Sequence, residues 1–519
     1  MPSFDAIIIG GGINGLAAAG KLAKGGQSVL LLEQRLVLGG GADMRSFAKG
    51  YQVSGLAHLI NVLDSRVEKE LELAKHGLSY VESNVATTAL SASGDHLLFG
   101  GAFGEQLEGD VSVAESRAWL ELRARLLAHA ATLKPFKQMV PPRLQAKAGN
   151  DMLALGKLAL GLRLRGREAL QDFLRLLLIN VFDVLEDELS DDRLKGLIAH
   201  DAVMGAFMGP RSPNSLLLLL NRLSGDVRGK AGALALPQGG MASVAQSMAK
   251  AIVALGVKTR VDATVSSIIV EGDKAIGVIL KSGERIEARR VISAINPQTT
   301  FMHLVGPRQL DVGFVRQAQS IRMRGTVAKL HLALSGAPNF REANLRTRLV
   351  IAPSARAVEN QFNPVKYNQF SPEPVMEMVL PSAFEDGYAP AGHHVLSANV
   401  QFAPTSPEGG WAKAKPAFLK AIMKQLEHYA PGISKQVVAT ELLTPEDIER
   451  EYGLVGGNWH HGELAVERMM FLRPFAGVAQ YETPISGLYL AGAGSHPGGG
   501  ISGAAGWSAA TKILKGGRA

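Results

Sequence analysis

The sequence predicts an α/β fold built around a Rossmann-like, dinucleotide-binding domain. An apolar run, Ala6–Ile9, leads directly into Gly10-Gly11-Gly12-Ile13-Asn14-Gly15, and a second apolar run, Val29–Leu32, ends at Glu33. A strand, a glycine-rich turn, a helix and a second strand that ends in an acidic residue make up the βαβ unit that binds dinucleotides. A strand-then-glycine pattern returns at Leu488–Gly492. This domain is therefore predicted to be assembled from separate segments.

Each part of the first motif has a physical role. We expect Gly10 to allow a tight turn, Gly12 to let the backbone approach a pyrophosphate, and Gly15 to let the helix pack closely on the strand. The helix that follows offers free N–H groups and the positive end of its dipole to the same pyrophosphate. Glu33 is placed to accept hydrogen bonds from the hydroxyls of an adenosine ribose.

The remaining elements follow from hydrophobic periodicity and turn residues. Apolar residues at three- and four-residue spacing predict helices from about Val111 to Leu223, including a buried helix over Asn214–Leu223. Turn residues such as Gly272-Asp273 and Ser282-Gly283 separate short apolar or alternating runs. We therefore predict a helix over Ala242–Leu255, strands over Thr264–Val270, Ala275–Leu280, Arg285–Ala288 and Arg290–Ala294, and a terminal helix from Ala504 to about Leu514.

These elements predict a discontinuous nucleotide-binding domain with an inserted α+β substrate domain. At 519 residues the chain is long enough for two or more domains. We expect the nucleotide-binding domain to comprise residues 1–90, 235–301 and 474–519, and the substrate domain to comprise a mostly helical segment, 91–234, and a mixed segment, 302–473. The ligand crevice should lie between the two domains.

Composition excludes several classes of chemistry. The chain contains no cysteine, which removes disulfides, thiolate nucleophiles, cysteine-ligated metals and a cysteine-linked cofactor. No segment reaches the roughly 20 apolar residues of a membrane span, and no leader precedes the first strand, so we expect a cytoplasmic protein. The net charge of +8 is modest for this length and nothing resembles a nucleic-acid-binding module, so we expect no nucleic-acid partner.

A basic, leucine-rich stretch at residues 153–178 allows two interpretations. Its charged donors are Lys157, Arg163, Arg165, Arg167 and Arg175. Such a stretch can lie on a membrane surface, which would make the protein peripheral to a membrane. It can equally be a domain helix whose arginine stems cover apolar surface, and this is the interpretation that we favour.

Several short motifs together identify a family. They are Leu32-Glu33-Gln34-Arg35, Leu236-Pro237-Gln238-Gly239-Gly240-Met241, Ser293-Ala294-Ile295-Asn296-Pro297, Gly456-Gly457-Asn458-Trp459-His460-His461-Gly462 and Gly492-Ala493-Gly494-Ser495-His496-Pro497-Gly498-Gly499-Gly500. With these motifs the whole chain resembles the FAD-dependent phytoene desaturase-like flavoproteins, and within them the branch named for pyridine nucleotide-disulfide oxidoreductase domain-containing protein 2. The resemblance implies an FAD-binding fold of glutathione reductase or amine oxidase type, with FAD bound non-covalently.

The resemblance also implies which residues hold the cofactor. Gly12, Ile13 and Asn14 would face the pyrophosphate, Gln34 or Arg35 would flank the ribose, and Val265 would offer its backbone to the adenine. A helix starting near Gly503 would direct its positive end at the N1–C2=O region of the flavin. The full set of implied cofactor-binding residues is Gly10, Gly12, Ile13, Asn14, Gly15, Glu33, Gln34, Arg35, Gly40, Gly41, Val265, Gly492, Gly500, Ile501 and Ser502.

Because the flavin carries the redox chemistry, the protein needs only to orient a C–H bond and to manage a proton. The candidate catalytic residues are His461, His58 and His496, with His460 as a further proton handler. A histidine can act as a base near neutral pH or hold a substrate carbonyl, but for each of these histidines taken singly we favour a purely structural hydrogen bond. The pairs His393-His394 and His460-His461 have no partner at ligand spacing, so we expect no metal site.

The leading functional hypothesis is an FAD-dependent dehydrogenase or desaturase. It would introduce a C=C bond into an apolar, alicyclic or isoprenoid-like small molecule by hydride transfer to flavin N5 and removal of a proton, with oxygen or another electron acceptor. The alternatives are a flavin amine oxidase and a non-catalytic FAD-binding interaction protein. Two departures from the family pattern, Gly506-Trp507-Ser508 and the leucine run with Asn221 at its end, are expected to alter the substrate pocket.

Overall fold

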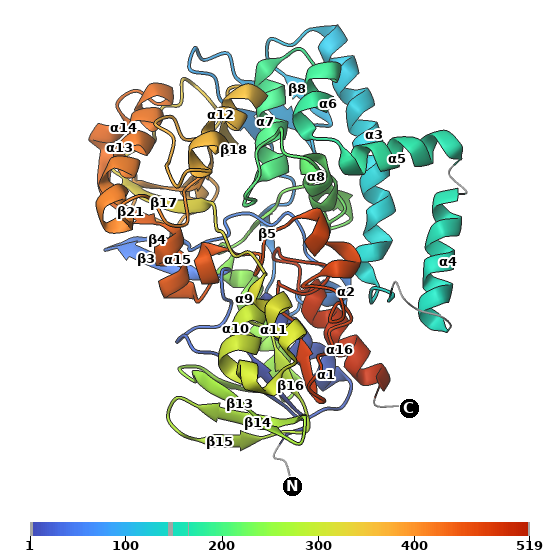
Figure 1. The fold of residues 1–519 in the computed structure, drawn as a ribbon. Helices are drawn as coiled ribbons and strands as arrows, with labels where there is room; N and C mark the ends of the chain where they lie inside the picture. The colour runs from blue at the N-terminus through green and yellow to red at the C-terminus, as the bar shows by residue number, and fades with distance from the viewer. Residues whose placement is uncertain (1–3, 144–148, 164–165, 517–519) are drawn as a thin grey trace.

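The computed structural model describes residues 4–143, 149–163 and 166–516. The lower part of the molecule in Figure 1 is built on a five-stranded sheet in the order β12-β2-β1-β16-β22, in which every pair is parallel. Its strands are β1 (Ala6–Ile9), β2 (Val29–Leu32), β12 (Lys258–Arg260), β16 (Val291–Ser293) and β22 (Leu488–Leu490). These strands come from the beginning, middle and end of the chain, so the predicted discontinuous Rossmann-like fold is confirmed.

Helices cover this sheet because its central strands are apolar on both faces. Every residue of β1 and β2 is buried, the pattern of parallel strands that lie between helices. The helix α1 (Ile13–Lys24) follows the glycine-rich turn and packs against α9 (Ala242–Ala254) and α16 (Ala504–Gly516). A Cβ on Gly506 would lie only 1.8 Å from the Asn14 carbonyl oxygen, so glycine is required where α1 and α16 meet.

A three-stranded antiparallel sheet extends from one end of this domain (Figure 1). It is formed by β13 (Val265–Glu271), β14 (Lys274–Leu280) and β15 (Arg285–Glu287). Each of these strands starts and ends within one residue of the bounds predicted from turn residues and alternation. Val265 is the first residue of β13. It lies close to the carboxyl ends of β1 and β2.

The other half of the molecule contains an eight-stranded sheet in the order β21-β17-β20-β19-β18-β6-β7-β8, in which β18 and β6 pair in parallel and the other pairs are antiparallel. One face packs on α13 (Trp411–Tyr429), where Leu330, Leu396 and Phe418 are fully buried in one core. The strands are β6 (Thr87–Ala89), β7 (Leu97–Gly100), β8 (Gln106–Glu108), β17 (Val327–Leu334), β18 (Arg348–Ile351), β19 (Met376–Val379), β20 (His394–Gln401) and β21 (Val437–Leu443).

A helical layer packs on the other side of this sheet. It contains α3 (Val113–Gln138), α6 (Val181–Glu188), α7 (Asp192–Val203) and α8 (Ser215–Leu223), and α4 (Asn150–Arg163) and α5 (Arg167–Leu178) extend outward from it. Residues Leu216 to Leu220 are at most 6% exposed, which confirms the predicted buried helix. The strands β7 and β8 also fall within residues 91–234, and the domain limits themselves stay a prediction.

Short elements connect these layers. They are β3 (Met44–Ala48), β4 (Tyr51–Ser54), α2 (Ser65–Glu70), β5 (Tyr80–Glu82), β9 (Asp226–Val227), β10 (Lys230–Ala231), β11 (Leu236–Pro237), α10 (Pro297–Thr299), α11 (Val312–Gln319), α12 (Ala355–Val365), α14 (Ile433–Gln436) and α15 (Pro445–Tyr452). Among the residues described, no helix is both long and apolar enough to cross a membrane.

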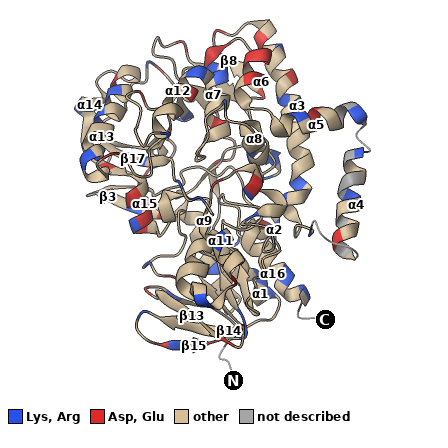
Figure 2. Cartoon of the chain, in the orientation of Figure 1, with Lys and Arg blue, Asp and Glu red and all other residues tan. Residues whose placement is uncertain are grey.

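Charged residues of both signs are interspersed over the molecule (Figure 2). The predicted basic stretch forms α4 and α5, which project from the body in Figure 1. Met152, Leu153 and Leu160 on α4 are exposed, whereas Arg165 lies outside the described residues. Contact of this stretch with a membrane surface stays a prediction.

Candidate active site

A cavity of about 520 Å³ lies between the two halves of the molecule. One part is lined by residues at the carboxyl ends of β1, β2 and β16, which is where parallel sheets bind dinucleotides. The other part is lined by residues of α7, α8, β18, β19 and β20 from the second half. The crevice predicted between a nucleotide-binding part and a substrate part is therefore present as one continuous space.

The glycine-rich turn forms an open cradle in this cavity. A Cβ added to Gly12 would meet only the Gly40 Cα, at 4.0 Å, so it would project into the cavity rather than into the fold. Gly10 and Gly40 have φ angles of +101° and +59°, which other residues rarely adopt. The cradle thus leaves backbone surface bare at the N-terminus of α1, as close approach of a pyrophosphate requires.

The acid at the end of β2 is held in place by the backbone. Glu33 is 6% exposed, and its carboxylate accepts hydrogen bonds from the N–H groups of Gly11 at 2.7 Å and Arg35 at 2.9 Å. Arg35 donates to the Gly40 carbonyl oxygen at 3.1 Å and to Asp43 at 2.6 Å. Arg35 therefore fixes the loop over the cradle, and the Glu33 carboxylate keeps free lone pairs for ribose hydroxyls.

Most of the predicted cofactor residues line the cavity, and three of them do not. Those in its lining are Gly10, Gly12, Ile13, Asn14, Glu33, Gln34, Arg35, Gly40, Gly41, Val265, Gly500 and Ile501. Gly15 and Gly492 lie behind it, since a Cβ on Gly15 would sit 1.9 Å from the Gly10 carbonyl oxygen and one on Gly492 would sit 2.6 Å from that of Ala294. The Ser502 hydroxyl accepts from the Ala504 N–H at 3.2 Å, at the start of α16. These three residues support the lining instead of forming it.

The three predicted catalytic histidines have different environments. His496 lies outside the cavity lining, with its ring nitrogens 2.9 Å from the Met470 carbonyl oxygen and 2.7 Å from that of Phe136. His496 therefore connects the last turn of α3 to the glycine-rich segment 492–500 in which it lies. His58 and His461 both line the cavity.

His58 lines the cavity but has no free ring nitrogen. Lys329 donates to its Nδ1 at 2.9 Å, so its Nε2 carries the hydrogen and faces Glu377 at 3.2 Å. Burial, with the nearby Lys329, lowers the pKa of His58 to about 4. Burial also lowers the pKa of Lys329 to about 7. His58 therefore serves as a connector between a lysine and a carboxylate.

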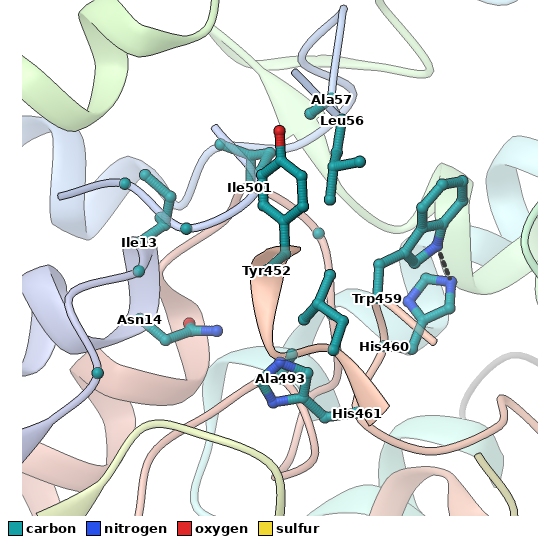
Figure 3. A pocket seen from close by; sticks show the side chains of 18 of the residues that line it. Ile13, Asn14, Leu56, Ala57, Tyr452, Trp459, His460, His461, Ala493 and Ile501 are labelled. Atoms are coloured by element: carbon teal, nitrogen blue, oxygen red, sulfur yellow. Dashed lines mark hydrogen bonds between the residues drawn. The ribbon is translucent and has the colours of Figure 1, made fainter. Parts of the chain in front are cut away.

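His460 and His461 present free nitrogens (Figure 3). The Trp459 indole N–H donates to Nε2 of His460 at 2.9 Å, so neutral His460 carries its hydrogen on Nδ1. The Nδ1 atoms of both His460 and His461 are buried and have no hydrogen-bond partner among the described residues. Burial, with Arg473 next, lowers the pKa of His460 to about 3 and that of His461 to about 4. Both rings are therefore neutral at pH 7 and line the cavity.

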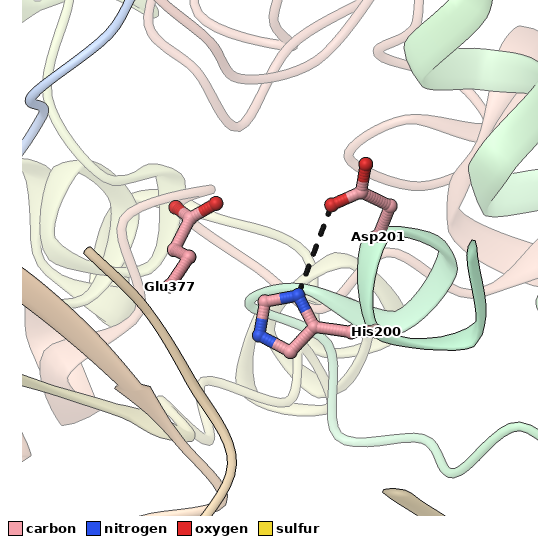
Figure 4. Close-up of side chains that lie close together, drawn as sticks. All are labelled: His200, Asp201 and Glu377. Carbon is pink, nitrogen blue, oxygen red and sulfur yellow. Dashed lines mark ion pairs between the residues drawn. The ribbon is translucent and has the colours of Figure 1, made fainter. Parts of the chain in front are cut away.

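A buried ion-pair network forms part of the inner wall. The Arg348 guanidinium donates to both oxygens of Asp201, at 2.7 and 2.9 Å, and to Glu377 at 2.9 Å. His200 Nδ1 lies 3.7 Å from Asp201, and His200, Asp201 and Glu377 face one another in a group that could hold a metal ion (Figure 4). Because the guanidinium already binds both carboxylates, we interpret the group as an ion-pair network, and the expected lack of a metal stays a prediction.

The sequence did not identify this network. Asp201, Arg348 and Glu377 come from α7, β18 and β19, which are distant in the chain. The sequence offers a local signal only for Lys329, the partner of His58, because this charged residue interrupts the largely apolar run Val327–Leu334, whose residues are all buried. Of the two family departures, Leu218 and Asn221 do line the cavity. Trp507 does not, because it is buried in α16 beneath the Lys21 ammonium, 4.5 Å from the ring centre.

The bare glycine cradle, the fixed ribose-binding acid and the adjoining chamber define an FAD-dependent oxidoreductase. The glycines and Glu33 fit FAD because the space that their backbone leaves open is where the dinucleotide would lie. The chain belongs to the family of flavin containing amine oxidoreductases, whose model matches residues 13–514. FAD is accordingly its cofactor, as the resemblance to phytoene desaturase-like flavoproteins implied.

Two relatives and one solved structure are similar to the chain. Pyridine nucleotide-disulfide oxidoreductase domain-containing protein 2 of Rattus norvegicus is 30% identical over 99% of this chain and 94% of its own length. A component of the limonene dehydrogenase of Castellaniella defragrans is 24% identical over 98% of this chain and 94% of its own length. Cyclohexylamine oxidase from Brevibacterium oxydans is similar in structure, with a TM-score of 0.60, 16% identity and full coverage of both chains.

Proposed function

We propose that this protein is an FAD-dependent dehydrogenase or desaturase that introduces a C=C bond into a molecule with an apolar, alicyclic or isoprenoid-like body. The observation that carries the proposal is His461, which lines a cavity that continues from the cofactor cradle and whose Nδ1 has no hydrogen-bond partner among the described residues. A neutral imidazole there is able to take a proton from carbon. The relative named as a limonene dehydrogenase component supports C–H oxidation of an alicyclic hydrocarbon as a chemistry of such chains.

The reaction removes two hydrogens from adjacent carbons. FAD, when bound, supplies the acceptor for one hydrogen and the electron pair of its C–H bond. The second hydrogen leaves as a proton, for which His461 Nδ1 is the acceptor, and the electron pair of that bond becomes the new π bond. The His460 Nδ1–H is a donor that can hold a carbonyl oxygen next to the reacting carbons. Oxygen or another electron acceptor then reoxidises the cofactor.

An amine oxidase is the second candidate, since a cyclohexylamine oxidase shares the fold. The aromatic residues that line the cavity are Tyr452 and Trp459. The Tyr452 hydroxyl donates to Asp43 at 3.3 Å and its ring lies against Arg35, 4.4 Å from the guanidinium carbon to the ring centre. Tyr452 is thus committed to the loop over the cradle, which disfavours an aromatic pair around an amine.

Flavin absorbance under argon tests the proposed function. We expect the visible band of the purified holoenzyme to persist with NADH or NADPH and to bleach with an alicyclic ketone or a polyene. Bleaching by nicotinamide within seconds would replace the desaturase by a reductase. Bleaching by amines alone would establish the amine oxidase. An intact band with every compound would favour the non-catalytic FAD-binding protein.

His461→Ala is predicted to slow anaerobic flavin reduction by substrate at least about tenfold, since general-base catalysis contributes this much or more. The rate should be measured per bound FAD by stopped-flow absorbance. His496→Ala is the control, because His496 is a histidine of the neighbouring segment 492–500 that lies outside the cavity lining. Equal rates in wild type and His461→Ala would return His461 to a structural role.

A further inference from the structure

The wall of the cavity between α3 and α8 gathers polar side chains. Lys137 comes from the last turn of α3, Asn221 and Arg222 come from the last turn of α8, and Asn61 precedes α2. All four line the cavity. The Lys137 ammonium donates to the backbone carbonyl oxygen of Asn221 at 2.9 Å. The ammonium therefore lies beside the residue that directly precedes Arg222.

These four side chains have donors to spare. Within the described residues, the side-chain amides of Asn61 and Asn221 make no hydrogen bond. The Lys137 ammonium has one acceptor there, the backbone carbonyl oxygen of Asn221. Arg222 has one contact, from Nη1 to Asp201 at 3.4 Å, although a guanidinium carries five N–H groups. Donors without acceptors, on side chains that face a cavity, are suited to a ligand that supplies acceptor oxygens.

The charges on this part of the cavity do not balance. Lys137, Arg222 and Arg348 stand against two carboxylates, Asp201 and Glu377. Arg348 contacts both of these carboxylates and Arg222 contacts Asp201 alone, so the group carries an excess of one positive charge, which corresponds to Lys137. Asp64, whose charge acts on Lys137, is itself paired with Arg66 at 2.6 Å. Burial lowers the pKa of Lys137 to about 8, so its ammonium form still predominates at pH 7.

We propose that Asn61, Lys137, Asn221 and Arg222 form a subsite for a carboxylate, and that the substrate is an alicyclic or isoprenoid-like carboxylic acid. The proposal rests on the proposed function and names its substrate class. Leu218 and Arg222 are four residues apart on α8, so they share a helix face and offer an apolar contact beside a cationic one. A positively charged amine would meet an excess of positive charge at this wall, which disfavours it as a ligand.

Equilibrium binding to the holoenzyme tests the subsite without turnover. Cyclohexanecarboxylate and its neutral amide, cyclohexanecarboxamide, are titrated into the oxidised protein and followed by the shift of the flavin band and by calorimetry. We expect the acid to bind at least about tenfold more tightly than the amide at pH 7. Its affinity should fall between pH 7 and 9, because the Lys137 ammonium loses its proton as the pH rises through a pKa of about 8.

Variants locate the effect. Arg222→Met and Lys137→Met should each weaken binding of the acid about tenfold, leave binding of the amide unchanged and retain FAD, while Arg222→Lys should keep part of the affinity. Lys420→Met, on an exposed face of α13, is the matched control. Equal affinity for acid and amide, or unaltered affinity for the acid in both methionine variants, would overturn the subsite. Loss of FAD in Lys137→Met would assign Lys137 to the cofactor and also count against it.

The outcomes separate this subsite from the proposed function. If an alicyclic ketone bleaches the flavin but carboxylates bind no better than amides, the desaturase proposal stands and the carboxylate subsite is wrong. If carboxylates bind through Arg222 and Lys137 but no ketone, polyene or carboxylic acid bleaches the flavin, the subsite stands and the proposed function is wrong.

Discussion

Gly12→Leu is expected to lower the affinity for FAD at least about 100-fold, which corresponds to about 2.7 kcal/mol of binding free energy. The reason is that a side chain at this position has no neighbour within the fold except the Gly40 Cα at 4.0 Å, and so it fills the cradle where the cofactor backbone must approach. The measurements are the FAD-to-protein ratio after purification and the dissociation constant from flavin fluorescence. The melting temperature of the apoprotein should stay close to that of wild type.

Two further glycines make the Gly12 result specific. Gly156→Leu, on α4, adds the same side chain where no atom lies within 4 Å, and it should leave FAD binding unchanged. Gly15→Ala places a Cβ 1.9 Å from the Gly10 carbonyl oxygen, so it should destabilise the apoprotein as well as reduce FAD binding. Stoichiometric, tightly bound FAD in Gly12→Leu would contradict the assignment of this turn to the pyrophosphate.

The nucleotide-binding half could be predicted because its signals are local. Apolar runs followed by glycine marked β1 and β22, and an apolar run that ends at Glu33 marked β2. The helix predicted over Ala242–Leu255 extends over Ala242–Ala254 in the structure. The apolar and turn residues that predict each of these elements lie within about ten residues of one another in the sequence. The sheet order then follows from the family of βαβ folds.

The eight-stranded sheet could not be predicted in the same way. Its β6 strand precedes the helical segment, yet it pairs with β18, more than 250 residues further along the chain. Short strands such as β7 and β8 lie inside a segment with mostly helical periodicity. Pairing between distant strands is set by tertiary packing, which no local pattern records.

The candidate site likewise combines residues that a local motif predicts with residues that only the tertiary structure brings together. The glycines and Glu33 were predicted because a motif with fixed spacing carries them. The Asp201–Arg348–Glu377 network was missed because its three charged residues are far apart in the sequence and meet only where one helix and two strands pack together. The tautomer of His460 likewise depends on a neighbour, Trp459, whose indole direction only the structure gives.

Arg348→Met is predicted to be the most destabilising substitution of the inner wall. It should lower the free energy of unfolding at pH 7 by about 3–5 kcal/mol. Arg348 is 1% exposed, and its removal would leave the carboxylates of Asp201 and Glu377 buried without their main partner. Chemical denaturation of the apoprotein measures this loss. Arg356→Met, an exposed arginine of α12, is the control and should change stability by less than about 0.5 kcal/mol.

The same variant has a characteristic dependence on pH. Burial acts to raise the pKa of Asp201, but Arg222 and Arg348 outweigh burial and hold that pKa below its ordinary value; the pKa of Glu377 is likewise lowered despite burial, by His58 and Arg348. In wild type these carboxylates therefore stabilise the fold above the unfolded pKa of about 4, and this contribution is lost as the pH falls further.

In Arg348→Met the effect of burial is no longer opposed by Arg348, so both pKa values rise and the carboxylates become neutral at a higher pH. The stability difference from wild type should consequently shrink as the pH is lowered from 7 to 5. Adding Asp201→Asn and Glu377→Gln to Arg348→Met should recover most of the lost stability at pH 7, since no uncompensated charge is then buried. A stability difference independent of pH, with no recovery in the triple variant, would mean that Arg348 acts through packing rather than through charge.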